Sequence, residues 1–322
     1  MNITLAKSLN QSLLDILDQN EKSVLIGEDI AQNGGVFKIT ENLYQKHPNR
    51  VINSPIAETL LGGLAVGLST QGMLPIIEFQ FSGFMYPAME QIIHHAARMR
   101  NRTRGRLTCP IIYRAPFGGG IGAPEHHSES PEAYFAHTPG LRVIIPSCPE
   151  AGDSLLKQSA QCQDPVIFLE PKRIYQRLFS SSSPSNKPYT LGKANVWIEG
   201  KELTMISWGA MLLDCYELVK QNNIHADLID LSSIKPIDWP TLIQSIQKTS
   251  RCVIVQESPL TCSVGSEIAS YLSRHCFSEL KAPIEIVSGY DTIMPYYQLE
   301  QEYLPSSDRI EQAICNVLEY EC

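Results

Sequence analysis

Short apolar segments alternate with helix-forming segments along most of the chain. In the first half, strands are expected at residues 23–26, 74–80, 110–114, 142–145 and 166–169, with helices at 4–20, 55–71, 88–100, 131–137 and 149–162. This alternation indicates an α/β fold with a mainly parallel, buried sheet flanked by helices. Ligands of such sheets bind beyond the carboxyl ends of the strands. Three polar or glycine-rich stretches occupy those ends: the turn before Glu58, residues 81–84, and the loop at 118–127.

The 322 residues are about right for two domains. A serine- and proline-rich stretch, Ser180-Ser-Ser-Ser-Pro-Ser-Asn-Lys-Pro, has the composition of a linker. We therefore predict a first domain at 1–178, a linker at 179–190 and a second α/β domain at 191–322. Strands of the second domain are expected at 203–208, 226–231, 252–256 and 284–287. Because it has fewer glycine loops and clustered histidines, we interpret it as a scaffold and interaction domain.

Composition narrows the range of partners. A net charge of −8 disfavours nucleic acid, and a solvated or interface face explains the one basic patch, Arg98 to Arg106. No apolar run approaches a membrane-spanning length, and residues 1–7 lead into an amphipathic helix without signal-peptide features. We expect a cytoplasmic protein, most simply a bacterial one. The nine cysteines form no CxxC pair, which predicts reduced thiols, no disulfide and no zinc.

A single carboxylate, Glu58, stands in the first turn of a helix that is apolar almost all round and is therefore expected to be buried. Carboxylates are rarely buried unless they are paired or functional. The alternative is an acid that complements the helix dipole at a solvated helix end. The local pattern alone leaves both interpretations open.

The densest chemical cluster is His126-His127-Ser128, which follows the glycine-rich loop. A histidine held in such a loop suits acid–base work on a ligand. A metal site is disfavoured because adjacent side chains diverge, and a surface histidine pair is the remaining alternative. His94 and His95 are interpreted as structural or interface residues, and His137 could serve either purpose. No G-x-S-x-G motif is present, which argues against a serine hydrolase.

Several longer motifs come in a characteristic order and spacing. They are Ser54-Pro-Ile-Ala-Glu, Glu78-Phe-Gln-Phe, Pro116-Phe-Gly-Gly-Gly, His127-Ser-Glu-Ser-Pro-Glu-Ala, Pro139-Gly-Leu-Arg-Val-Ile-Ile-Pro-Ser and Pro165-Val-Ile-Phe-Leu-Glu-Pro-Lys-Arg-Ile-Tyr. Over nearly its whole length the chain resembles the beta subunits of the thiamine-diphosphate-dependent first component of 2-oxoacid dehydrogenase complexes. The resemblance implies a transketolase-like pyrimidine-binding domain followed by a transketolase C-terminal domain.

The resemblance also assigns roles to individual residues. Glu58 matches the glutamate that hydrogen-bonds a ring nitrogen of the cofactor's aminopyrimidine and so helps to remove the thiazolium proton; the apolar helix suits it to partial protonation. Phe84 matches the aromatic ring that lies against the aminopyrimidine, and Gln80 is placed with the cofactor-binding residues. His127 matches the histidine that faces the substrate and the incoming lipoyl group. His126 has a counterpart in some relatives only.

Thiamine-diphosphate enzymes usually carry a Gly-Asp-Gly motif, followed by asparagines, that holds magnesium and the diphosphate, and this chain has none. The resemblance therefore implies that a separate alpha subunit holds the diphosphate and the magnesium, in a heterotetramer of two alpha and two beta chains. Some family members also bind potassium through backbone carbonyls. The matching positions here are Ile111, Ile112, Ser159, Cys162 and Asp164.

The motifs look more like those of branched-chain members, which act on 3-methyl-2-oxobutanoate and related acids, than those of pyruvate or acetoin members. The implied reaction is decarboxylation of the 2-oxoacid and reductive acylation of a lipoyl group on an acyltransferase core. A non-catalytic scaffold homologue is a weaker alternative, because Glu58, Phe84 and His127 are all present. A self-sufficient transketolase-like synthase is disfavoured by the missing diphosphate motif and the short chain.

Overall fold

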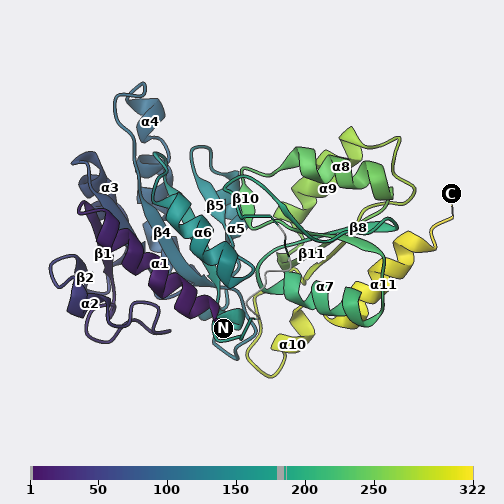
Figure 1. The fold of residues 1–322 in the computed structure, drawn as a ribbon, viewed down its shortest axis with the longest axis horizontal. Helices are drawn as coiled ribbons and strands as arrows, with labels where there is room; N and C mark the ends of the chain where they lie inside the picture. Colours follow the sequence, from purple (N-terminus) through teal and green to yellow (C-terminus); the bar gives the residue numbers. More distant parts are fainter. Residues whose placement is uncertain (1–2, 180–184, 186, 322) are drawn as a thin grey trace.

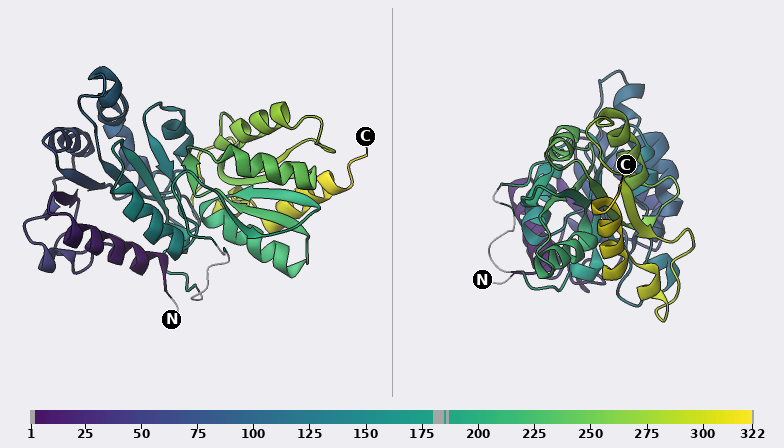
Figure 2. Two further views of the ribbon diagram at one scale, coloured as in Figure 1. Left: turned by 45° about the horizontal axis from the view of Figure 1, so that its top comes forward. Right: turned by 90° about the vertical axis from the view of Figure 1, so that its right-hand side faces the viewer.

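The computed structural model describes residues 3–179, 185 and 187–321, and it contains two sheets, each flanked by helices. The N-terminal half of the chain forms one lobe and the C-terminal half the other (Figures 1 and 2). Most strand pairs are parallel, as the sequence predicts. The residues of the expected linker at 180–184 and 186 lie outside the described part. Tyr189, at its end, is buried and donates a hydrogen bond to Asp230.

The first sheet has seven strands in the order β10-β5-β6-β4-β3-β1-β2. Their bounds are β1 Ser23–Gly27, β2 Val51–Asn53, β3 Leu74–Glu78, β4 Ile112–Phe117, β5 Arg142–Ile144, β6 Val166–Pro171 and β10 Ser233–Lys235. The expected strand at 110–114 thus lies two to three residues further along. Strand β10 comes from the expected second domain and pairs antiparallel with β5, so the two halves of the chain share one sheet.

Helices cover both faces of this sheet. On one face, α1 (Leu5–Gln19) packs against α6 (Pro149–Ser159), and their leucines enter one core with the inward side chains of the strands. On the other face lie α3 (Glu58–Thr70) and α5 (Glu132–His137), whose buried side chains belong to a second core. A short helix, α2 (Leu43–Lys46), precedes β2. The alternating side-chain directions of buried parallel strands explain why both faces are apolar.

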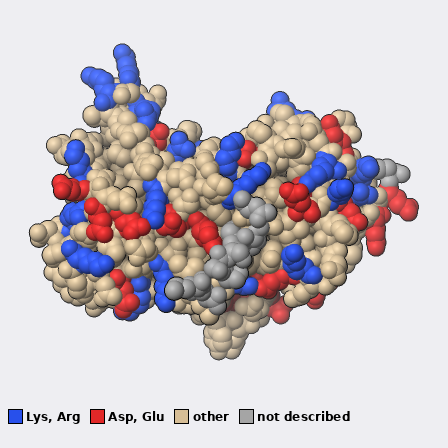
Figure 3. Space-filling view, in the orientation of Figure 1, with Lys and Arg blue, Asp and Glu red and all other residues tan. Residues whose placement is uncertain are grey.

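The stretch expected as a helix at 88–100 is helical, but it is not one regular α-helix. The chain instead forms a 3-10 segment, η1 (Ser82–Ala88), a π-helical segment, η2 (Gln91–Ala96), and one turn of α-helix, α4 (Met99–Arg102). Pro87, which has no backbone N–H to donate, lies in η1 just before this stretch. The basic residues 98–106 surround α4, which projects from the first lobe and carries Lys or Arg side chains at its tip (Figure 3).

The expectation that the Glu58 helix is buried is also wrong for this single chain. Only Leu61, Gly62, Ala65 and Ser69 of α3 are buried. Leu60 and Leu64 are 52% and 39% exposed, and Ile56 just before the helix is 82% exposed. One face of the helix packs on η1 and η2, while the opposite apolar face is open to solvent.

The second sheet has five strands in the order β12-β11-β8-β9-β7. Their bounds are β7 Asn195–Ile198, β8 Leu203–Ser207, β9 Ala226–Asp230, β11 Cys252–Pro259 and β12 Glu285–Gly289; the helices are α7 Gly209–Gln221, α8 Trp239–Thr249, α9 Val264–His275, α10 Glu300–Tyr303 and α11 Ser307–Leu318. Helices α7 and α11 cover one face, and α8 and α9 the other. None of the helices in the described ranges is long and apolar enough to cross a lipid bilayer.

A buried ion network joins the three central strands of the first sheet. Arg114 on β4 donates two hydrogen bonds to Glu170 on β6, at 2.7 Å from Nε and 2.8 Å from Nη2, and a third from Nη1 to Glu78 on β3. The Tyr175 hydroxyl donates to Glu170 at 2.6 Å. Burial raises the pKa of Glu78, the charge of Arg114 opposes that rise, and Glu170 adds to it. One guanidinium thus supplies the positive charge that both buried carboxylates, Glu78 and Glu170, need.

We predict that Arg114→Ala lowers the free energy of unfolding by about 3–5 kcal/mol, because it leaves buried carboxylates without their cation. Chemical denaturation of the purified chain measures this loss. The matched control is Arg98→Ala, an exposed arginine at the start of α4, which should change stability by no more than about 0.5 kcal/mol. A loss below about 1 kcal/mol for Arg114→Ala would contradict the dependence on this network.

Candidate active site

Four predicted site residues, and a fifth residue that was not predicted, Glu28, follow the carboxyl ends of neighbouring strands. Glu28 comes directly after β1, Glu58 opens the helix that follows β2, and Gln80 lies two residues beyond β3. Phe84 is in η1, and His127 ends the short segment η3 (Glu125–His127) in the loop after β4. The strands are adjacent and parallel, so this one edge of the sheet presents all five residues.

A second carboxylate, Glu28, accompanies Glu58 at this edge. Glu28 is buried, and its Oε1 has no hydrogen-bond partner among the described residues. Burial raises the pKa of Glu28, the negative charge of Glu58 raises it further, and a hydrogen bond from the Ala57 backbone opposes the rise. Glu58 itself is half-buried. Burial and the neighbouring Glu58 carboxylate thus favour the protonated form of Glu28.

The sequence interpretation missed Glu28. A signal for it was present, because Gly27-Glu28 directly follows the first buried strand and so occupies the carboxyl edge of the sheet. The nearby acid, Asp29, made this turn look like an ordinary polar loop.

His127 lies in an aromatic cluster. Its ring centroid is 4.4 Å from that of Phe81 and 5.1 Å from that of Phe84, and both contacts are edge-on. The helix that begins at Glu58 is tied to the same region, since the Thr59 hydroxyl donates to the Pro87 carbonyl of η1 at 2.9 Å. Segment η1 thus joins Phe84 and His127 to the Glu58 helix.

The surroundings of His127 favour its neutral form. Burial lowers its pKa below the ordinary value of 6.5, and the positive charge of Lys172 lowers it further. The His127 Nδ1 atom is buried and has no hydrogen-bond partner among the described residues. Lys172 is also buried and its ammonium is likewise unpartnered there; burial lowers its pKa to about 8. A weakly basic imidazole beside a buried cation can accept or release a proton within the physiological range.

The loop that carries His127 is fastened to η1. The Ser82 hydroxyl donates to the Glu129 carbonyl at 2.8 Å, and the Tyr86 hydroxyl donates to the Glu129 carboxylate at 2.9 Å. A Cβ at Gly83 would stand 2.3 Å from the carbonyl oxygen of His126, so only glycine allows this approach. The exposed His126 thereby contributes its backbone to the site.

The backbone positions suggested for potassium gather elsewhere, around the start of β4 and the end of α6. The Ile111 carbonyl accepts the Val166 N–H at 2.9 Å, and the Ser159 carbonyl accepts the Cys162 N–H at 3.1 Å. Ile112 begins β4, and Asp164 accepts a hydrogen bond from Arg100. The described part of the chain holds no group of three or more His, Cys, Asp or Glu side chains arranged for a metal ion. Its cysteines are free thiols.

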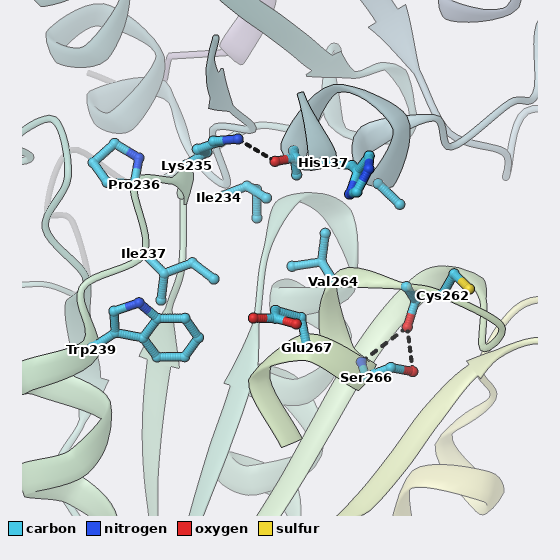
Figure 4. A pocket seen from close by; sticks show the side chains of 13 residues that line it. His137, Ile234, Lys235, Pro236, Ile237, Trp239, Cys262, Val264, Ser266 and Glu267 are labelled. Carbon is cyan, nitrogen blue, oxygen red and sulfur yellow. Dashed lines mark hydrogen bonds between the residues drawn. The ribbon is translucent and has the colours of Figure 1, made fainter. Parts of the chain in front are cut away.

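His137 borders two cavities. It lines one together with Ser128 and Glu129 of the His127 loop, and it also lies in the lining of a cavity of about 780 Å³ that α5 and β10 form with the starts of α8 and α9. His137 and Lys235 line its upper side in Figure 4, and Ser266 and Glu267 its lower side. Neither Glu58 nor His127 lines this cavity. The other two histidines named above, His94 and His95, are in η2, and Arg102 donates to the His94 carbonyl.

Comparisons with known proteins agree with this architecture. The transketolase pyrimidine-binding domain family matches residues 1–177, and the transketolase C-terminal domain family matches residues 192–310. A solved structure described as a split-gene transketolase, an inactive beta4 tetramer, superposes with a TM-score of 0.80 over 99% of both chains at 23% identity. These findings define a two-domain protein of the transketolase class.

Relatives that match over nearly their whole length identify the family within this class. The chain is 38% identical to the pyruvate dehydrogenase E1 component subunit beta of Leifsonia xyli subsp. xyli, over 99% of this chain and 96% of that one. It is 38% identical to the 3-methyl-2-oxobutanoate dehydrogenase subunit beta of Mycobacterium tuberculosis, over 98% and 92%. It is 37% identical to the 2-oxoisovalerate dehydrogenase subunit beta of Pseudomonas aeruginosa, over 99% and 95%. The chain belongs to the family of E1 beta subunits of 2-oxoacid dehydrogenases.

We predict that the His127 imidazole titrates below pH 6.5, because burial and the Lys172 ammonium both disfavour its protonated form. Nuclear magnetic resonance of the ring protons measures the midpoint. Lys172→Met removes the cation and should raise it, whereas Lys201→Met, at an exposed lysine of the second domain, should leave it unchanged. A midpoint at or above 6.5 in the unaltered chain would rule out this electrostatic picture.

Proposed function

We propose that this chain, together with an alpha subunit, decarboxylates a 2-oxoacid on thiamine diphosphate and transfers the acyl group to a lipoyl group. The observation that carries the proposal is the carboxylate pair at the sheet edge, where the half-buried Glu58 lies beside the buried, partly unpartnered Glu28. An unpartnered carboxylate oxygen in a buried place fits a ligand with hydrogen-bond donors, as an aminopyrimidine has.

The residues divide the work of holding the cofactor. Glu58 would hold a proton at the ring nitrogen of the aminopyrimidine, and Phe84 would place its half-buried ring against the flat heterocycle. Gln80, half-buried just beyond β3, would supply an amide to the same group. Thiamine diphosphate, when bound, supplies the carbon nucleophile that attacks the 2-oxo group. Protonation of Glu28 would relieve the repulsion between the two carboxyl groups while Glu58 hydrogen-bonds the ring.

His127 would act at the acyl-transfer stage. Its low pKa makes the imidazolium a stronger acid than an ordinary histidine, so it gives up its proton readily to a lipoyl sulfur. Edge-on contacts with Phe81 and Phe84 restrict the orientation of the ring. Fixed orientation of this kind is what a positioned acid needs.

A separate alpha subunit would complete the site. The chain has no Gly-Asp-Gly motif to hold magnesium and the diphosphate, and the open apolar face of α3, with Leu60 and Leu64, begins at Glu58 itself. An exposed apolar surface beside the proposed cofactor site fits coverage by another chain. The heterotetramer of two alpha and two beta subunits, the lipoyl-bearing acyltransferase core and a potassium ion at the 111–164 carbonyls are parts of this proposal.

The substrate is proposed to be a branched-chain 2-oxoacid of the 3-methyl-2-oxobutanoate type, on the motifs that run from His127 to His137 and from Phe168 to Arg173. The second candidate is pyruvate, which the similarity to pyruvate dehydrogenase subunits favours equally. Both candidates use the same site residues and differ only in the pocket for the side chain of the acid.

We predict that the purified chain alone decarboxylates neither 3-methyl-2-oxobutanoate nor pyruvate, and that activity emerges only on reconstitution with an alpha subunit. Release of CO2, measured with each substrate and with saturating thiamine diphosphate and magnesium, is the test. The ratio of kcat/KM values identifies the acid. Turnover by the beta chain alone would contradict the divided site.

In the reconstituted complex, Glu58→Ala should lower the decarboxylation rate by roughly 10²–10⁴-fold, because a positioned proton-handling group is lost. The fold should persist, since Glu58 is only half-buried. The matched control is Glu90→Ala, at an exposed glutamate just before η2. Near-normal decarboxylation by the Glu58→Ala complex would remove Glu58 from the mechanism.

A further inference from the structure

A carboxylate of the second domain reaches into the glycine loop of the first. Glu300, at the start of α10, is buried, and its two oxygens accept backbone hydrogen bonds from Gly120 at 2.7 Å and from Gly122 at 2.8 Å. Both bonds are charge-assisted and are of the strong kind. They join residues about 180 positions apart in the sequence.

The loop held in this way leads directly to His127. Gly118, Gly120 and Gly122 all have positive φ angles, which only glycine adopts without strain. The Gly118 N–H donates to the Glu129 carbonyl at 3.0 Å, so residues 118–129 form a closed loop with His127 near one end. A Cβ on Gly120 would stand 2.3 Å from the Arg173 side chain. Because the glycine backbone is conformationally free, this loop needs contacts from outside to hold one conformation.

A second carboxylate of the same domain supports the loop from the side. Glu257, in β11, is buried and accepts hydrogen bonds from the Gly119 N–H and from the Ser130 hydroxyl, the latter at 3.2 Å. The buried Lys172 and the half-buried Arg173 are both attracted to Glu257 and Glu300. The second domain thus grips both ends of the segment that contains His127.

We infer that Glu300 is a positioning residue for acyl transfer, which fixes the His127 loop by accepting the Gly120 and Gly122 N–H groups from the other domain. This inference rests on the proposed function of His127. It gives the C-terminal domain a direct part in the reaction, because a shift of α10 relative to the first sheet would move the loop and the imidazole together.

The decisive variant is Glu300→Gln, because glutamine keeps one acceptor oxygen and replaces the other with an NH2 group that cannot accept an N–H. Glu302→Gln is the matched control, at an exposed glutamate of the same short helix. Each variant is reconstituted with the alpha subunit. Two rates are compared: decarboxylation with an artificial electron acceptor, and transfer to a free lipoyl domain.

We expect Glu300→Gln to slow transfer to the lipoyl domain by about tenfold to 100-fold, the scale of a misplaced group, while artificial-acceptor decarboxylation changes by no more than about twofold. In a His127→Ala background, Glu300→Gln should cost nothing further in transfer, because both changes remove one function. Equal losses in both rates, or a full additional loss in the His127→Ala background, would overturn the positioning role.

Hydrogen exchange of the free beta chain separates this inference from the proposed function. Glu300→Gln should accelerate amide exchange in a peptide that covers residues 118–128, and Glu302→Gln should not. If the reconstituted complex decarboxylates no 2-oxoacid, the proposed function fails. Faster exchange in Glu300→Gln would still support the inference that Glu300 holds the loop by its hydrogen bonds to Gly120 and Gly122. Unchanged exchange in Glu300→Gln would overturn the inference that Glu300 holds the loop, whatever the decarboxylation rate of the complex.

Discussion

The fold depends on a single guanidinium placed between two buried carboxylates. Arg114 joins Glu78 and Glu170 across the three central strands of the first sheet. Separating these strands would leave a buried charge without its partner, at a cost of several kcal/mol. The ion pairs therefore hold β3, β4 and β6 together. The turns that leave their carboxyl ends carry the Phe84 segment and the His127 loop. The positions of the Phe84 segment and the His127 loop thus depend on the ion network between the strands that precede them.

Above this network the two domains contribute different things. The first supplies the groups proposed for chemistry, which are two coupled carboxylates, an aromatic cluster and a histidine of lowered pKa. The second supplies buried carboxylates that hold backbone N–H groups of the glycine loop. Strand β10 extends the first sheet with residues of the second half. The sequence interpretation of the C-terminal domain as a scaffold is therefore incomplete, because its side chains reach the loop of the site.

The elements with regular periodicity were predictable. Leu5, Leu9 and Leu13 define α1, and the apolar runs of β1, β6, β8 and β9 were placed within two residues of their observed bounds. Prediction was wrong where local geometry overrides the pattern. A π-helical stretch, Gln91–Ala96, replaces regular α-helix within 88–100. The apolar face of α3 looked buried because composition cannot tell a core from a surface that another chain would cover.

The sequence by itself determined the α/β class, the candidate residues Glu58 and His127, and the lack of a diphosphate-binding motif, because each of these is a matter of residue type and spacing along the chain. The candidate role of Phe84 is implied by the family resemblance. Only the tertiary structure decided which groups meet. The charge of Glu58 raises the pKa of Glu28, which follows a different strand, and Glu300 accepts a hydrogen bond from a loop 180 residues away. Such contacts depend on proximity in space, and no periodicity in the chain records them.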